Sequence, residues 1–282
     1  KELQALFKAL SAPALPGTVK AATRAYELSP DFRGLAASTQ YEYRLLLKEF
    51  DEQLGVLPVT TFAAPFLLEL RNAWAARGHR AANVRLTVLE HVLTPAIVAG
   101  LLNGNPFDHI KGVRRPADAP EPHRIWPDAV VSAVFEAALQ ERRFGLARAV
   151  AIARHVGARR GDLVKLSRAA RCDGRFRFVS GKRKVPVDVA EDPELTAMLA
   201  RTPDTQPLSP WQATRKAAVR RTVTESLTLV FNRQGRPYSE DGIALELRKL
   251  VERLAKAEAV DSAAYDFHGL RHARGVDLAL SG

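Results

Sequence analysis

The chain has 282 residues, 46% of them hydrophobic and 26% charged, a composition that is typical of globular domains and excludes wholesale disorder. Its single cysteine, Cys172, excludes an intrachain disulfide and a cysteine zinc cluster, and no apolar run reaches the roughly 18 residues of a membrane helix. Lys and Arg number 42 against 31 Asp and Glu, and residues 113–225 alone hold 22 basic and 13 acidic residues. An arginine-rich excess concentrated in one region favours a partner with a phosphate backbone, although solvated surface arginines account for part of it. We expect a cytoplasmic protein of about two domains.

Residues 1–113 predict an all-helical domain. Apolar periodicity predicts helices over residues 39–54, 65–76 and 81–99. Thr39 and Glu42 have the spacing of a capping box, and Pro65 suits the first turn of a helix. Residues 1–30 contain three prolines, which favour a mobile arm ahead of this domain.

Residues 114–127 contain four prolines, a composition typical of a stiff, extended linker. We therefore place the domain boundary there.

Residues 128–282 predict a second domain that mixes helices with a small sheet. Helices are predicted over residues 128–140, 144–156, 161–166, 239–256 and 268–280. Two alternating segments, 175–179 and 185–189, predict a hairpin with a turn at Ser180, and Pro186 favours an edge position for the second strand. We also predict a strand over residues 227–231 and an exposed loop over residues 202–221.

Three basic elements of this second domain carry candidate chemistry. They are Arg159 and Arg160 where one helix ends and another begins, the turn 180–184 around Lys182, and the run His268-Gly-Leu-Arg-His272. Residues three and four apart share a helix face, so the run projects its histidines and arginine together as donors suited to a phosphate. Each element alone is also typical of a solvated helix end, a charged hairpin or a capping histidine, whereas their order is far more specific.

Several other chemistries are disfavoured by the sequence. It has neither a P-loop nor a GxGxxG run, and the spacing of His268 and His272 lacks the glutamate of an HExxH zinc motif. We therefore predict no metal site and no cofactor.

The order of the three elements resembles the tyrosine recombinases, the phage integrase family, over about residues 35–282. That family carries an arginine in a T-G-x-R-x-x-E/D element, a lysine in a hairpin turn, and then H-x-x-R. Arg159 and Asp162 match the first element, although Val156 stands where the threonine is usual. Lys182 matches the second, with Lys184 as the competing register, and His268 with Arg271 matches the third.

The resemblance implies a mainly helical fold with a small β-sheet, built from two domains. Residues 1–113 would be a helical core-binding (SAM-like) DNA-binding domain, residues 114–127 the linker, and residues 128–282 a mixed α/β catalytic domain that is incomplete at its C-terminus.

The resemblance also implies site-specific DNA recombination or integration through a 3′-phosphotyrosyl intermediate, without a metal or another cofactor. Arg159 and Arg271 would bind the nonbridging phosphate oxygens, because a guanidinium fork matches them better than an ammonium does. His268 would donate to the phosphate or move the tyrosine proton, and Lys182 would protonate the departing 5′-oxygen.

The partner implied is double-stranded DNA, with the full-length protein a homotetramer on it and no small-molecule substrate. The candidate DNA contacts are Arg44, Arg80, Asn83 and Arg85 in the first domain and Arg183 and Lys184 in the hairpin. Each is about as well explained as an ordinary surface residue.

One departure from the family concerns the nucleophile. The family's catalytic tyrosine follows H-x-x-R, whereas all five tyrosines of this sequence precede His268. We expect the tyrosine to follow Gly282 in the native protein, and this chain alone to be inactive and monomeric. The alternatives are a non-catalytic DNA-binding regulator or accessory protein with the same fold, and a type IB topoisomerase, which the core-binding-like first domain disfavours.

Overall fold

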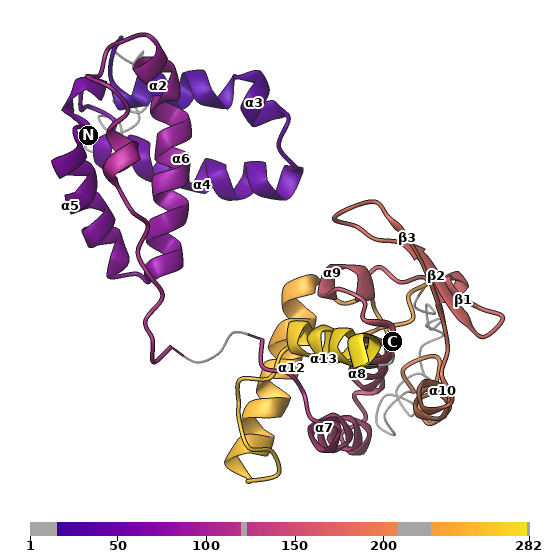
Figure 1. Ribbon diagram of the computed structural model, residues 1–282. Helices are drawn as coiled ribbons and strands as arrows, with labels where there is room; N and C mark the ends of the chain where they lie inside the picture. Colours follow the sequence, from indigo (N-terminus) through magenta and orange to yellow (C-terminus); the bar gives the residue numbers. More distant parts are fainter. Residues whose placement is uncertain (1–15, 120–122, 208–226, 281–282) are drawn as a thin grey trace, which may run out of the picture. The chain divides into compact units, whose positions relative to one another are not determined.

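A computed structural model describes residues 16–119, 123–207 and 227–280, and the chain divides into two compact units, Lys1–Ala119 and Pro120–Gly282 (Figure 1). The division falls within the proline-rich segment 114–127. Parts of the predicted arm and of the predicted loop 202–221 lie outside the described residues, and so do residues 281–282, where we expect Ser281-Gly282 to end the last predicted helix. None of the described helices is both long and apolar enough to span a bilayer.

The first unit is helical throughout its described part. Its elements are α2 (Val19–Glu27), α3 (Pro30–Arg33), α4 (Ala37–Leu54), η1 (Val59–Thr61), α5 (Ala64–Ala75), α6 (His79–Val98) and η2 (Pro106–His109). Their apolar faces meet in one core around Phe32, Phe50 and Leu89, which are fully buried.

Two expectations for this unit are wrong. Residues 16–30 are not an arm, because the Thr18 side chain caps α2, and Val19 and Tyr26 of that helix are buried in the core against α4 and α6. The pair Thr39 and Glu42 is not a capping box, because α4 begins two residues earlier and Ala36 at its start provides no side-chain cap.

The second unit is built around a buried helix. Its elements are α7 (Asp128–Gln140), α8 (Phe144–Val156), α9 (Arg160–Leu163), η3 (Arg168–Ala170), β1 (Arg171–Cys172), β2 (Arg175–Val179), β3 (Pro186–Ala190), α10 (Pro193–Ala200), α12 (Glu240–Lys256) and α13 (Phe267–Leu280). Helix α8 is buried on almost every side, because α7, α10, α12 and α13 all pack on it.

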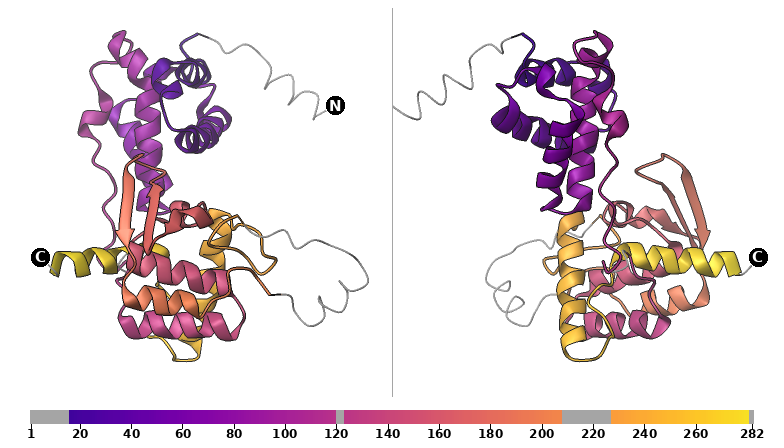
Figure 2. Two further views of the ribbon diagram at one scale, coloured as in Figure 1. Left: turned by 90° about the vertical axis from the view of Figure 1, so that its right-hand side faces the viewer. Right: turned by 60° about the vertical axis from the view of Figure 1, so that its left-hand side comes forward.

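The sheet of the second unit has the antiparallel order β1-β2-β3, with Phe178 opposite Val187. The proline at residue 186 begins an edge strand, as its missing N–H requires. The β2–β3 hairpin projects beyond the helices of its unit (Figure 2). Strand β1 and helix α10 are absent from the sequence predictions.

The predicted strand 227–231 is wrong, because this segment forms only isolated bridges, Thr228 to Ser167 and Phe231 to Pro237. It is held instead by α8, whose buried Arg148 donates to the carbonyl oxygen of Leu229 at 3.0 Å. The same guanidinium binds Thr202, which is buried, so the predicted loop 202–221 does not begin on the surface.

The segment 227–231 approaches α8 so closely that only glycine fits at residue 145. A Cβ atom added to Gly145 would collide with the backbone of Phe231. We expect Gly145→Ala to lower the free energy of unfolding by about 2 kcal/mol, as overpacking of a core does. Urea unfolding measures the loss. Gly275→Ala in α13 is the control, since nothing lies within 4 Å of its added Cβ, and it should be neutral or slightly stabilising.

Candidate active site

Arg159 lies at a sharp corner between α8 and α9. Gly157 ends α8 in the left-handed conformation, with φ 68°, and Arg159 is the extended residue just before α9. Glycine adopts a positive φ without steric cost, so it turns the chain sharply after the buried helix. The corner places the half-buried Arg159 at the surface of the second unit.

Arg271 faces the same corner from α13. Its guanidinium donates a hydrogen bond to the carbonyl oxygen of Gly157. Burial lowers the pKa of Arg271, and the positive charge of Arg159 lowers it further, while Asp162 opposes the shift. Two arginines that repel each other across a small space form a site that an anion would stabilise.

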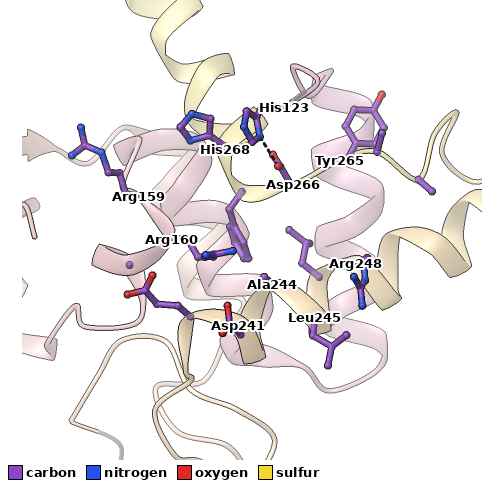
Figure 3. Close-up of a pocket in the computed structure, with 16 residues that line it drawn as sticks. His123, Arg159, Arg160, Asp241, Ala244, Leu245, Arg248, Tyr265, Asp266 and His268 are labelled. Carbon is purple, nitrogen blue, oxygen red and sulfur yellow. Dashed lines mark hydrogen bonds and ion pairs between the residues drawn. The ribbon is translucent and has the colours of Figure 1, made fainter. Parts of the chain in front are cut away.

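Two cavities meet at Arg159. The larger, of about 850 Å³, is lined by Arg159, His123, His268 and the face of α12 that carries Arg248 (Figure 3). The smaller, of about 230 Å³, is lined by Arg159, Arg271, Asp162, Ser180 and Arg183. His268 and Arg271 lie one turn apart on α13, so the structure brings the three predicted residues of the corner and the helix together.

The β2–β3 hairpin is tied to this corner by Asp162. Its buried carboxylate accepts a hydrogen bond from the backbone N–H of Gly181 at 2.7 Å, where the turn begins. Sequence matching identified Asp162 but not this contact. Arg183 is the cation of the turn that reaches a cavity wall, whereas the exposed Lys182 and Lys184 line neither cavity.

His268 is exposed and has two histidine neighbours. The centroid of its ring lies 4.3 Å from that of His123 and 4.7 Å from that of His272, both in edge-to-face contact. Partial burial lowers the pKa of His268, and the charges of His123 and His272 lower it further. Among the residues that the structure describes, no group of three His, Cys, Asp or Glu side chains is arranged to hold a metal ion.

Tyr265 also borders the larger cavity, but its hydroxyl is engaged elsewhere. The hydroxyl donates to Asp261 at 2.6 Å, and the ring packs on Trp126. Burial and the bond to Asp261 raise the pKa of Tyr265 to about 12. This tyrosine is therefore part of the core rather than a poised nucleophile.

The four candidate DNA contacts of the first unit differ in how exposed their side chains are and in whether these already bind another residue. Arg80 is exposed and pairs with no carboxylate of the described residues, and Arg44 is half exposed beside Glu27. Arg85 is largely buried and bound to both oxygens of a carboxylate. Asn83 exchanges two hydrogen bonds with the backbone of Val113. Sequence patterns could not reveal these last two pairings, because the partners lie 30 or more residues away.

The partner of Arg85 is Glu49, and their pair has a predictable pH dependence. Hydrogen bonding from Arg85 holds the pKa of Glu49 below its usual value of 4.5. The stabilisation is therefore present above that value and is lost as the pH falls through the lowered pKa. We expect Glu49→Gln to cost about 1.5 kcal/mol at pH 7 and clearly less at pH 2.5, where more of the carboxylate is protonated. Urea unfolding at several pH values checks this, and an equal cost at both pH values would contradict it.

Sequence comparison and structure comparison give different results for this chain. No protein-family model and no curated protein matches the sequence. A lambda integrase dimer bound to a COC′ core site matches 97% of this chain and 72% of its own, with 18% identity and a TM-score of 0.67. A lambda integrase tetramer bound to a Holliday junction matches 98% and 76%, with 17% identity and a TM-score of 0.69.

An integrase of the transposon Tn1549, in complex with circular intermediate DNA, matches 94% of this chain and 88% of its own, with 16% identity and a TM-score of 0.68. The chain therefore has the tyrosine recombinase fold, and the prediction of a mainly helical structure with a small sheet is confirmed.

Proposed function

We propose that this chain is the DNA-binding and phosphate-activating part of a site-specific recombinase or integrase. The observation that carries the proposal is the meeting of Arg159, Arg271 and His268 at adjoining cavities, from segments more than a hundred residues apart. A protein that only bound DNA would gain little from two arginines that repel each other in a partly buried corner.

In the proposed reaction, a tyrosine oxygen attacks a DNA phosphorus atom in line with the 5′-oxygen. The new P–O bond forms as the bond from phosphorus to the 5′-oxygen breaks, which leaves a 3′-phosphotyrosyl link. Arg159 and Arg271 neutralise the nonbridging oxygens, whose negative charge grows during the attack. His268 takes the tyrosine proton or donates to the phosphate, and Lys182 gives a proton to the 5′-oxygen.

Rejoining reverses these steps with the 5′-hydroxyl of another strand. The phosphodiester energy is kept in the phosphotyrosyl link, so the reaction consumes no ATP. In the proposed step the guanidinium groups of Arg159 and Arg271 supply the positive charge that a metal ion supplies in other phosphoryl transfers. Tyr265 is not proposed as this nucleophile, because its hydroxyl donates to Asp261 and its ring lies in the core.

The partner in this proposal is double-stranded DNA, acted on in the cytoplasm by a homotetramer of the complete gene product. Support comes from the fold, which is shared with integrases whose structures contain DNA, as a dimer in one case and as a tetramer in another. Arg80, Arg44 and the hairpin cations Arg183 and Lys184 would contact phosphates, which position a duplex without reading its sequence.

The test begins by selecting bound duplexes from random-sequence DNA with this chain. The selected duplex is then nicked near its centre and incubated with the complete gene product. We expect a covalent protein–DNA adduct that survives denaturation. Protease digestion of this adduct should leave DNA whose 3′-phosphate is joined to a peptide through a tyrosine.

Arg159→Ala is the matched variant. It should abolish the adduct while changing the affinity for the selected duplex by less than about threefold, since one phosphate contact is a small share of the total. If the wild-type product binds the duplex but never forms the adduct, the chain is a DNA-binding regulator with a recombinase fold, and the proposed reaction is wrong.

A further inference from the structure

The last residues of the proline-rich segment form one wall of the candidate active site. Asp266, just before α13, uses both of its carboxylate oxygens. One oxygen accepts the N–H of Gly269 at 2.8 Å and so caps α13, while the other binds Nδ1 of His123 at 2.7 Å. A single carboxylate therefore connects the start of the helix that carries His268 to a residue 143 positions away.

Further contacts fix this segment on α13. The indole N–H of Trp126 donates to the carbonyl oxygen of Asp266 at 2.8 Å. Arg124 pairs with Asp261 at 2.6 Å, and its carbonyl oxygen lies so close to Gly269 that a Cβ atom there would collide with it. The path of residues 123–126 is thus specified by hydrogen bonds, an ion pair and a glycine contact.

His123 itself has an unusual backbone. Its φ is 60°, in the left-handed region that residues other than glycine rarely adopt. Such strain persists only where surrounding contacts determine it, and it concentrates at functional sites. Here the conformation turns the imidazole toward Asp266 on one side and His268 on the other (Figure 3).

We propose that His123 is a positioning residue for His268, holding that imidazole in place through edge-to-face contact while Asp266 holds His123. The inference rests on the proposed function, because it assigns His123 a role through a residue of that reaction. It makes the end of the linker a part of the active site rather than a simple spacer.

The charged groups around His268 determine what a change at His123 does. On its own helix His272 and Arg271 oppose the protonation of His268, Asp266 favours it, and His123 opposes it from the linker. The other charged side chains of the larger cavity are Arg159, Arg160, Glu240, Asp241 and Arg248. Removing His123 exposes more of the His268 ring and takes away one of the neighbours that oppose its protonation, so the pKa of His268 should rise.

The first measurement uses this chain alone and needs no DNA cleavage. Side-chain NMR of isotope-labelled histidines follows the titration of His268 in the wild type and in the variants His123→Ala and Asp266→Asn. We expect the titration midpoint of His268 to move upward in His123→Ala, and the contact signal between the two rings to weaken in Asp266→Asn. Asparagine still caps a helix, so this second variant separates the link to His123 from the folding of α13.

The second measurement is the pH profile of adduct formation by the complete gene product. His123→Ala should lower the rate at neutral pH by about tenfold, and the limb of the pH profile that follows His268 should move to higher pH together with the titration midpoint of His268. His272→Gln is the matched control. It removes the other ring neighbour, whose charge also lowers the pKa of His268, so the titration midpoint of His268 should rise here as well. Because Asp266 does not hold this ring, the maximal rate of His272→Gln should stay within about twofold of the wild type.

The outcomes separate the two claims. An unchanged titration of His268 in His123→Ala, or an unchanged pH profile despite lower activity, would overturn the positioning role. If the titration of His268 moves as expected but the wild-type gene product never forms an adduct, the recombinase function fails while the hold of His123 on His268 stands.

Discussion

Replacing Arg271 by lysine is expected to slow DNA strand cleavage by about a hundredfold, and Arg271→Ala by about a thousandfold. The lysine keeps a positive charge and can still donate to the carbonyl oxygen of Gly157. It cannot, however, present two parallel donors to a phosphate while it makes that bond. The measurement is the single-turnover rate of adduct formation on a nicked duplex that the wild type cleaves.

The control for this prediction is Arg274→Lys, one turn further along α13. Arg274 lies beside Gly157 but lines neither cavity. The rate of adduct formation by Arg274→Lys should remain within about threefold of the wild-type rate. Arg271→Lys and Arg274→Lys should both bind the duplex with the affinity of the wild type. Equal losses in the two variants would mean that α13 needs its arginines for packing, and the assignment of Arg271 to the phosphate would be wrong.

The elements that the sequence predicts best are those whose signals are local. Helices α7 and α8 begin and end where periodicity and Gly157 place them. Helix α12 lies within the predicted segment 239–256, and Ser239 caps it. Helix α2 was missed because the three prolines of residues 1–30, all of which lie outside the helix, suggested an arm, although Thr18 provides a local cap. The segment 227–231 has the composition of a strand, but it pairs only through isolated bridges, and Arg148 of α8 donates to its Leu229 carbonyl oxygen instead.

In the candidate site, too, the features with local sequence signals could be predicted and those that depend on distant contacts could not. Spacing along one helix predicts that His268 and Arg271 share a face, and the resemblance predicts that Arg159 acts with them. Arg159 lines one cavity with His268 and the other with Arg271, while the roles of the three residues stay predictions. The place of His123 could not be predicted, because its proline-rich surroundings indicate a spacer and its partner Asp266 lies 143 residues away. That pairing depends on the path of the chain, which no local pattern encodes.

Three cations of the β2–β3 hairpin, Lys182, Arg183 and Lys184, are candidates for the general acid. Lys182 and Lys184 are exposed, and Lys184 has a left-handed φ of 54° while its N–H closes the turn on the carbonyl oxygen of Ser180. Arg183 lines the smaller cavity beside Arg159. A general acid must release a proton, which an arginine in a protein does not do, whereas a lysine can.

We therefore expect Lys182→Ala to slow cleavage by about a thousandfold, and a sulfur substitution at the leaving 5′-oxygen to restore most of that rate. A thiolate leaves without a proton from the protein, so the modified DNA bypasses the missing acid. Arg183→Ala should slow cleavage because a phosphate contact is lost, and the sulfur-substituted DNA should not restore its rate. The four single-turnover rates, two variants on two substrates, decide the assignment.

Lys184→Ala supplies the comparison within the same turn. Its backbone already performs a structural task at the turn, so loss of the side chain should cost less than about fivefold and should not respond to sulfur. If the sulfur substrate instead rescues Lys184→Ala and leaves Lys182→Ala slow, the register of the hairpin is shifted by two residues. The acid would then be the lysine whose left-handed backbone fixes its direction, and the strain at that residue would acquire a function.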